Sequence, residues 1–246
     1  MVNAFDPSQP GALDPALGRM IERRGRLLGP AYRLFYQTPV EVCRAQGTRL
    51  YDSQGRDYLD AYNNVASVGH CHPHVVAAVH AQMQTLCTHT RYLQDGILDY
   101  AEAMLPGLGG RIGAGGHLMF TCTGSEANDL AIRIARHHTG RNGIIVTDEA
   151  YHGNSELTAG FSPSLGRGAR LGTWVRRVPA PDSYRHAPAA LGQMMAAAVT
   201  RAAEELARHG DGLAAFVADA LFSSDGIFAT PEVLGPVAAA VLPLCK

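Results

Sequence analysis

The sequence predicts an α/β protein with a mostly parallel sheet flanked by helices, preceded by a small N-terminal α+β segment. After residue 70, short apolar runs alternate with stretches of helical periodicity, which is typical of β-α-β units. Before residue 70, one helical pattern precedes alternating apolar and polar residues, which indicates a small antiparallel sheet. We therefore expect an N-terminal segment over residues 1–70 and a larger domain over residues 71–246.

The N-terminal segment contains one predicted helix and one predicted sheet. Residues 14–28 have helical periodicity, and Gly29-Pro30 ends the pattern. Residues 40–62 alternate in polarity, and Gln46-Gly47 and Gln54-Gly55 interrupt them as turns. These features predict a helix followed by two hairpins.

The middle of the chain predicts two helices and then a strand. Pro73 stands at a favourable first position of a helix, and a shorter helix covers about residues 97–105. A glycine-rich loop over residues 107–116 follows them. The apolar run 117–120 predicts a short buried strand, and the helical pattern after it ends at Gly140.

The remainder of the chain alternates strands and helices and contains one long loop. Residues 154–172 have no periodicity, which predicts a functional or mobile loop. The predicted strands are 143–147, 174–178 and 213–218, and the predicted helices are 189–208 and 231–244. Because such alternation builds parallel strands, their carboxyl ends should share one edge of the sheet.

Composition narrows the class of function. The chain has 246 residues, of which 46% are hydrophobic, so it can fill a proper core. A net charge of −1 without a basic stripe argues against nucleic-acid binding. No apolar run reaches membrane-spanning length, and the polar start is not a signal peptide. The 5 cysteines include no C-x-x-C pair, which favours free thiols and a cytoplasmic location.

A turn between the strand at 117–120 and the next helix has the features of a phosphate site. Thr123-Gly124-Ser125 lies where free backbone N–H groups and the positive end of the helix dipole point outward. Gly124 permits close approach of an anion, and Ser125 adds a hydroxyl donor. The alternative interpretation makes Ser125 an ordinary N-cap, with Asn128 on the first helical turn.

Two further candidate positions follow predicted strands. Tyr151-His152 offers an aromatic face suited to a flat heterocycle, and Asp219 offers a carboxylate. Because ligands collect at the carboxyl ends of parallel strands, both should lie near Gly124-Ser125. Together they indicate a site for a phosphorylated aromatic cofactor, although each position alone is also common in caps and turns.

Four motifs in order resemble the class III aminotransferases, which are pyridoxal-phosphate enzymes of fold type I. Thr123 to Asn128 resembles their cofactor phosphate loop, and Tyr62 to Pro73 resembles their N-terminal signature. Thr90-Arg91-Tyr92 and Tyr151-His152-Gly153 match further signatures. The resemblance extends from about Tyr32 to the end of the chain.

The resemblance implies pyridoxal 5'-phosphate as the cofactor. Gly124 and Ser125 would bind its phosphate, Tyr151 would stack on its pyridine ring, and Glu126 and Asn128 would support the loop. Members of the family transfer an amino group between an amine or amino acid and a 2-oxo acid, and they share active sites across a homodimer. The cofactor-binding residues expected here are Gly124, Ser125, Glu126, Asn128, Tyr151, His152 and Asp219.

Other family landmarks do not match. Asp219 stands where relatives usually carry a glutamate near the substrate. Three further landmarks of the family have no counterpart in this sequence: the aspartate that pairs with the pyridine nitrogen, the Schiff-base lysine and a later threonine. The sole lysine is Lys246. We therefore expect an N-terminal portion of such an enzyme, without a catalytic lysine. The open alternatives are an amine-phosphate lyase of the same family and a non-catalytic remnant or dimerisation partner.

The competing chemistry is metal binding or thiol catalysis. His70, His72 and His74 alternate, with Cys71 among them and His80 nearby. In an extended strand the three histidines would share a face, but the helix start at Pro73 would scatter them. Cys122 at the end of the predicted strand lacks an oriented base, which argues against a Cys/His hydrolase.

Overall fold

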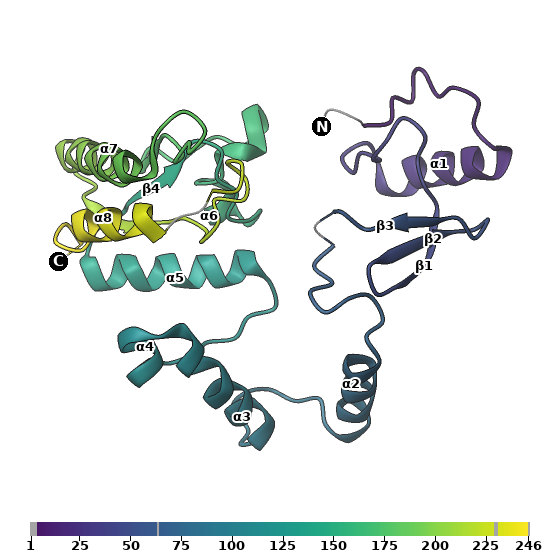
Figure 1. Ribbon diagram of the computed structural model, residues 1–246, viewed down its shortest axis with the longest axis horizontal. Coiled ribbons are helices and arrows are strands. Elements are labelled where there is room, and N and C mark those ends of the chain that lie inside the picture. The colour runs from purple at the N-terminus through teal and green to yellow at the C-terminus, as the bar shows by residue number, and fades with distance from the viewer. Residues whose placement is uncertain (1–3, 63, 229–230, 246) are drawn as a thin grey trace. The chain divides into compact units, whose positions relative to one another are not determined.

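A computed structural model describes residues 4–62, 64–228 and 231–245 (Figure 1). Asn63 of the N-terminal signature and Lys246 lie outside the described residues. The chain separates into two compact units, Met1–Tyr100 and Ala101–Lys246. The domain boundary near residue 70 stays a prediction.

The first unit contains the predicted helix and antiparallel sheet. Helix α1 (Pro15–Leu28) begins at Asp14, whose carboxylate accepts hydrogen bonds from the N–H groups of Ala16 and Leu17. The strands β1 (Val42–Gln46), β2 (Arg49–Asp52) and β3 (Asp57–Leu59) form an antiparallel sheet in chain order. The predicted helix and both hairpins are confirmed. Helices α2 (Pro73–Thr85) and α3 (Asp95–Met104) follow.

The second unit is built on a three-stranded parallel sheet. Its strand order is β5-β4-β6, with β4 (Gly143–Thr147) at the centre between β5 (Val175–Val178) and β6 (Leu213–Phe216). The predicted parallel α/β architecture is confirmed. The helical elements are η1 (Leu105–Leu108), α4 (Gly110–Gly115), α5 (Gly124–Thr139), α6 (Glu156–Ala159), η2 (Pro163–Gly168), α7 (Pro188–Arg208) and α8 (Pro231–Val241).

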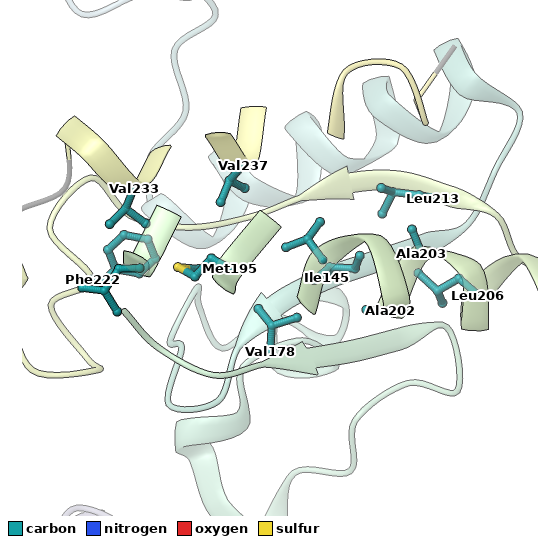
Figure 2. Packing of buried hydrophobic residues seen from close by; sticks show 12 residues of the cluster. Ile145, Val178, Met195, Ala202, Ala203, Leu206, Leu213, Phe222, Val233 and Val237 are labelled. Atoms are coloured by element: carbon teal, nitrogen blue, oxygen red, sulfur yellow. The ribbon is translucent and has the colours of Figure 1, made fainter. Parts of the chain in front are cut away.

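The core of this unit lies on both faces of β4. Every residue of β4 is buried, and successive side chains point to opposite faces of the sheet. On one face, Ile145 packs with residues of α7 and α8 such as Leu206 and Val237 (Figure 2). On the other face, Ile144 and Val146 pack with Ile132 of α5. Burial on both faces explains why β4 reads as a continuous apolar run.

Two assignments of secondary structure from the sequence are wrong, the strand at 117–120 and the continuous loop at 154–172. Residues 117–120 form no strand, and Met119 and Phe120 are 66% and 42% exposed. A strand needs a neighbour for its backbone groups, and none of the described strands pairs with this run. The loop 154–172 contains α6 and η2, which are too short to show periodicity.

The glycine-rich loop also differs from the prediction, because η1 and α4 occupy most of residues 107–116. A β-carbon on Gly113 would lie 2.9 Å from the carbonyl oxygen of Leu105, so close packing of helical turns requires glycine here. Among the described residues, no helix is both long enough and apolar enough to cross a bilayer.

Candidate cofactor site

A cavity of about 450 Å³ lies at the carboxyl ends of β4 and β6, beside the first turn of α5. Of the residues predicted at the cofactor, only Glu126 does not line it. The lining residues are Gly124, Ser125, Asn128, Tyr151, His152, Gly153, Val217, Ala218 and Asp219. Three segments that are distant in sequence therefore meet at the sheet edge where ligands bind in parallel α/β proteins.

The N-terminus of α5 is capped by Thr123. Its hydroxyl oxygen accepts from the N–H of Glu126 at 3.1 Å, and a carboxylate oxygen of Glu126 accepts from the N–H of Cys122 at 2.9 Å. This reciprocal pair is a variant of the capping box. The interpretation of Ser125 as the N-cap is therefore wrong. Glu126 stabilises the turn from outside the cavity.

Capping leaves the cavity side of this turn open. The first N–H groups of a helix have no intrahelical acceptor, and the Thr123 hydroxyl serves Glu126 rather than Gly124 or Ser125. A β-carbon on Gly124 would meet no atom within 4 Å. An anion can therefore approach these N–H groups at the positive end of the helix.

Three residues of α5 bind the connection that follows β4. The Ser125 hydroxyl accepts from the N–H of Asn154 at 3.1 Å and donates to its side-chain oxygen at 3.2 Å. The Asn128 amide donates to the carbonyl oxygen of His152 at 2.7 Å. Asp129 accepts from the hydroxyl of Ser155, also at 2.7 Å.

These α5 contacts have a consequence for the predicted donor. A hydroxyl has one hydrogen, so Ser125 must turn it away from the Asn154 side chain to donate to a phosphate. It can still accept from the Asn154 N–H. The sequence did not indicate Asn154 or Ser155 as partners of α5. Its spacing does place Ser125, Asn128 and Asp129 on one face of that helix.

His152 is a buried polar side chain at the cavity wall. It is 8% exposed, and its main-chain N–H donates to the hydroxyl of Ser162 at 2.9 Å. Its Nε2 is buried and has no hydrogen-bond partner among the described residues. Burial lowers the pKa of His152, opposed by the charges of Asp219 and Asp225 and by the Val217 carbonyl. The neutral ring thus retains one nitrogen for a polar partner.

Tyr151 and Asp219 both border the cavity, but only Asp219 has its side chain engaged in hydrogen bonds to its own turn. Tyr151 is 47% exposed, so part of this residue is accessible from solvent at the cavity. The carboxylate of Asp219 accepts from the N–H of Leu221 at 2.9 Å and from the N–H and hydroxyl of Ser223 at 3.0 and 3.1 Å. Asp219 therefore stabilises its own turn while it borders the cavity.

The residues considered for metal binding and thiol catalysis make other contacts in the structure. Among the described residues, no group of three or more histidine, cysteine, aspartate or glutamate side chains could hold a metal ion. His70 instead pairs with the carboxylate of Asp60 at 2.7 Å. Cys122 is exposed, and its main-chain N–H contacts Glu126.

The sequence profile described as Aminotransferase class-III matches residues 34–245. The chain belongs to the class III aminotransferase family. It is 35% identical over 222 residues to "Alanine--glyoxylate aminotransferase 2-like" from Drosophila melanogaster, covering 86% of this chain and 44% of the relative. It is 37% identical over 170 residues to "Ethanolamine-phosphate phospho-lyase homolog 1" from Caenorhabditis elegans, covering 68% and 36%.

Solved structures show the same fold. An Arthrobacter phospholyase in complex with phosphoethanolamine is 39% identical, with a TM-score of 0.83, covering 92% of this chain and 54% of that one. A taurine:2-oxoglutarate aminotransferase from Bifidobacterium kashiwanohense is 20% identical, with a TM-score of 0.71, covering 92% and 53%. The predicted family and fold type I architecture are confirmed. The chain spans about half the length of these relatives or less.

Pyridoxal 5'-phosphate is the cofactor of class III aminotransferases, and the cavity fits it. A volume of about 450 Å³ is within the usual range for small-molecule sites, about 300–1,000 Å³. The open β-carbon position of Gly124 and the helix N-terminus suit a phosphate. The exposed ring of Tyr151 and the unpartnered Nε2 of His152 suit a flat, polar heterocycle.

Proposed function

We propose that this chain forms the cofactor-binding part of a class III enzyme that transfers an amino group between an amine or amino acid and a 2-oxo acid. The observation that carries the proposal is the convergence of Gly124-Ser125, Tyr151-His152 and Asp219 on one cavity. We further propose that residues 1–70 belong to the small domain and residues 71–246 to the large domain.

Five of the residues at the cavity have a distinct part in this proposal. The N–H groups of Gly124 and Ser125, with the Ser125 hydroxyl, hold the cofactor phosphate. Tyr151 covers one face of the ring and excludes water from it. Asn128 fixes the backbone at His152, whose neutral ring offers Nε2 to a polar group. When bound, pyridoxal phosphate supplies an electron sink for the substrate amine.

Proton transfer in this reaction needs a lysine. In the family a lysine would hold the cofactor and move the substrate proton, whereas the one lysine of this chain is Lys246, which lies outside the described residues. We propose that the chain binds the cofactor but does not transaminate by itself.

A second candidate is an amine-phosphate lyase of the same family. The identity of 39% to the Arthrobacter phospholyase, with a TM-score of 0.83, favours it. The two reactions can be distinguished by assay. The lyase releases inorganic phosphate, whereas the transferase consumes a 2-oxo acid. The third alternative is a non-catalytic remnant or dimerisation partner.

Two further properties belong to the proposal. We expect a homodimer, because family members complete their active sites across a two-fold axis. We expect a cytoplasmic location, and this expectation is supported by five cysteines that are all free. Size-exclusion chromatography with light scattering tests the first, and localisation of the tagged protein in its source cell tests the second.

The decisive experiment is a titration with pyridoxal phosphate, followed by absorbance and by induced circular dichroism. Ser125→Ala removes one hydrogen bond and should weaken binding about fivefold, which corresponds to about 1 kcal/mol. Gly124→Ala and Gly124→Val fill the open β-carbon position of Gly124. Both should weaken binding of pyridoxal phosphate, and the valine should weaken it more than the alanine. Ser183→Ala, in an exposed turn away from the cavity, is the control. Equal affinity in all four variants and the wild type would exclude the turn from the site.

A further inference from the structure

Tyr151 lies on a connection that is fixed on both sides. Downstream, α5 binds the backbone of His152 and Asn154. Upstream, the hydroxyl of Thr147 donates to one carboxylate oxygen of Asp225 at 2.6 Å, and the N–H of Glu149 donates to the other at 3.0 Å. The carboxylate of Asp225 thus spans the point where the chain leaves β4.

The loop between β6 and α8 holds this carboxylate in place. Phe222 is 1% exposed and packs beside Val233 and Met195 in the core (Figure 2). Its carbonyl oxygen accepts from the N–H groups of Asp225 and Gly226 at 3.0 and 3.1 Å. A buried aromatic side chain therefore anchors the turn that presents Asp225, and a rigid support makes both of its hydrogen bonds more effective.

The partner of Asp225 is equally constrained. Thr147 is 1% exposed at the end of a fully buried strand, so its hydroxyl needs a hydrogen-bond acceptor. Thr147 also accepts, through its carbonyl oxygen, from the N–H of Ala150 at 3.3 Å. The segment from Thr147 to Ala150 is therefore a closed turn, and Tyr151 follows it directly.

We propose that Asp225 is a positioning residue, which clamps this turn through Thr147 and Glu149 and so sets the place of the Tyr151 ring in the cavity. The inference rests on the proposed cofactor site. Asp225 does not line that cavity. The charge of Asp225 also acts on His152 at the cavity wall. The effect proposed here is a separate one, which passes through the backbone that leads to Tyr151.

Hydrogen exchange on the full chain without cofactor tests the clamp. Asp225→Ala and Thr147→Val should each raise exchange over residues 148–151 by about tenfold. Thr147→Ser keeps the hydroxyl and should restore the wild-type rate. Asp148→Asn removes a charge from the same turn, where Asp148 makes a half-exposed ion pair with Arg177 at 3.7 Å, and should leave exchange unchanged. Unchanged exchange in Asp225→Ala and Thr147→Val overturns the proposal. If Asp225→Ala fails to fold, the two Thr147 variants decide.

A double-mutant cycle tests the path through Tyr151. In the wild-type background, Asp225→Ala should weaken pyridoxal phosphate binding about five- to tenfold and reduce its induced circular dichroism. In the Tyr151→Ala background, Asp225→Ala should weaken pyridoxal phosphate binding less than twofold further, because the ring that Asp225 positions is absent. An equal loss in both backgrounds shows a merely structural role and overturns the proposal. If the wild-type chain binds no pyridoxal phosphate, the proposed function fails, and the exchange measurement alone decides the clamp.

Discussion

A β-carbon on Gly153 would lie 2.5 Å from the hydroxyl oxygen of Ser125. The hydroxyl oxygen of Thr158 would lie 2.6 Å from the same β-carbon, and Gly153 has a φ of 138°, which side-chain-bearing residues rarely adopt. The close contact between α5 and the connection after β4 therefore depends on glycine at this position.

Gly153→Ala should lower the free energy of unfolding by about 2–4 kcal/mol, because backbone strain and steric overlap add at this site. Urea denaturation followed by circular dichroism measures it. Gly124→Ala is the matched control, since its β-carbon would meet no atom within 4 Å. It should leave stability nearly unchanged while it weakens cofactor binding. Equal stability of the two variants would contradict the close packing at Gly153.

The sequence predicted most of the second unit because its signals are local. The periodicity of α5 and α7 and the apolar run of β4 each define an element without knowledge of its neighbours. Parallel topology then places strand ends at one edge, which is why Ser125, Tyr151 and Asp219 could be assigned to one site.

The sequence could not predict features that depend on partners distant in the chain. The run 117–120 has the composition of a strand, but pairing decides strand formation, and the described sheet gives it no neighbour. Asp225 looks like an ordinary turn residue, and its bond to Thr147 joins residues 78 positions apart. The alternative interpretation placed the N-cap at Ser125 rather than Thr123, because serine and threonine are both favoured at that position.

His152 should make stability depend on pH. Burial lowers its pKa in the folded chain, so the unfolded chain binds the proton more readily. The contribution of the neutral His152 ring to the free energy of unfolding is fully present above the pKa of histidine in the unfolded chain, about 6.5. It is lost as the pH falls through the pKa of His152 in the folded chain. Unfolding free energies in urea from pH 7.5 to 5.5 should fall less steeply in His152→Gln than in the wild type.

The control for the pH dependence is His138→Gln, at an exposed position near the end of α5. It should reproduce the wild-type slope between pH 7.5 and 5.5. If His152→Gln and His138→Gln give the same slope, the buried ring does not govern stability in this range.

Helix α2 should promote self-association. Its apolar side chains recur at helical spacing and are exposed, with Val75 at 45%, Val76 at 56%, Val79 at 52% and Met83 at 68%. An apolar patch of this kind usually marks an interface or an aggregation site. We expect the chain to be oligomeric or poorly soluble in light scattering. Val76→Glu with Val79→Glu should increase the monomer fraction, whereas Gln82→Glu on the same helix should not. A wild-type chain that is a stable monomer would contradict the prediction.

Incubation with pyridoxal phosphate, borohydride reduction and peptide mapping should give no stoichiometric labelling of Lys246. This is the only lysine, and no family motif that surrounds a Schiff-base lysine matches the sequence around it. An unperturbed lysine has a pKa of about 10.4 and is protonated at neutral pH, whereas a Schiff-base lysine must be held at the aldehyde with a lowered pKa. We expect sparse labelling, shared with the α-amino group of Met1. Saturable labelling of Lys246 that Ser125→Ala and Tyr151→Ala together abolish would show that this lysine reaches the cofactor, and would overturn the proposal that the chain does not transaminate by itself.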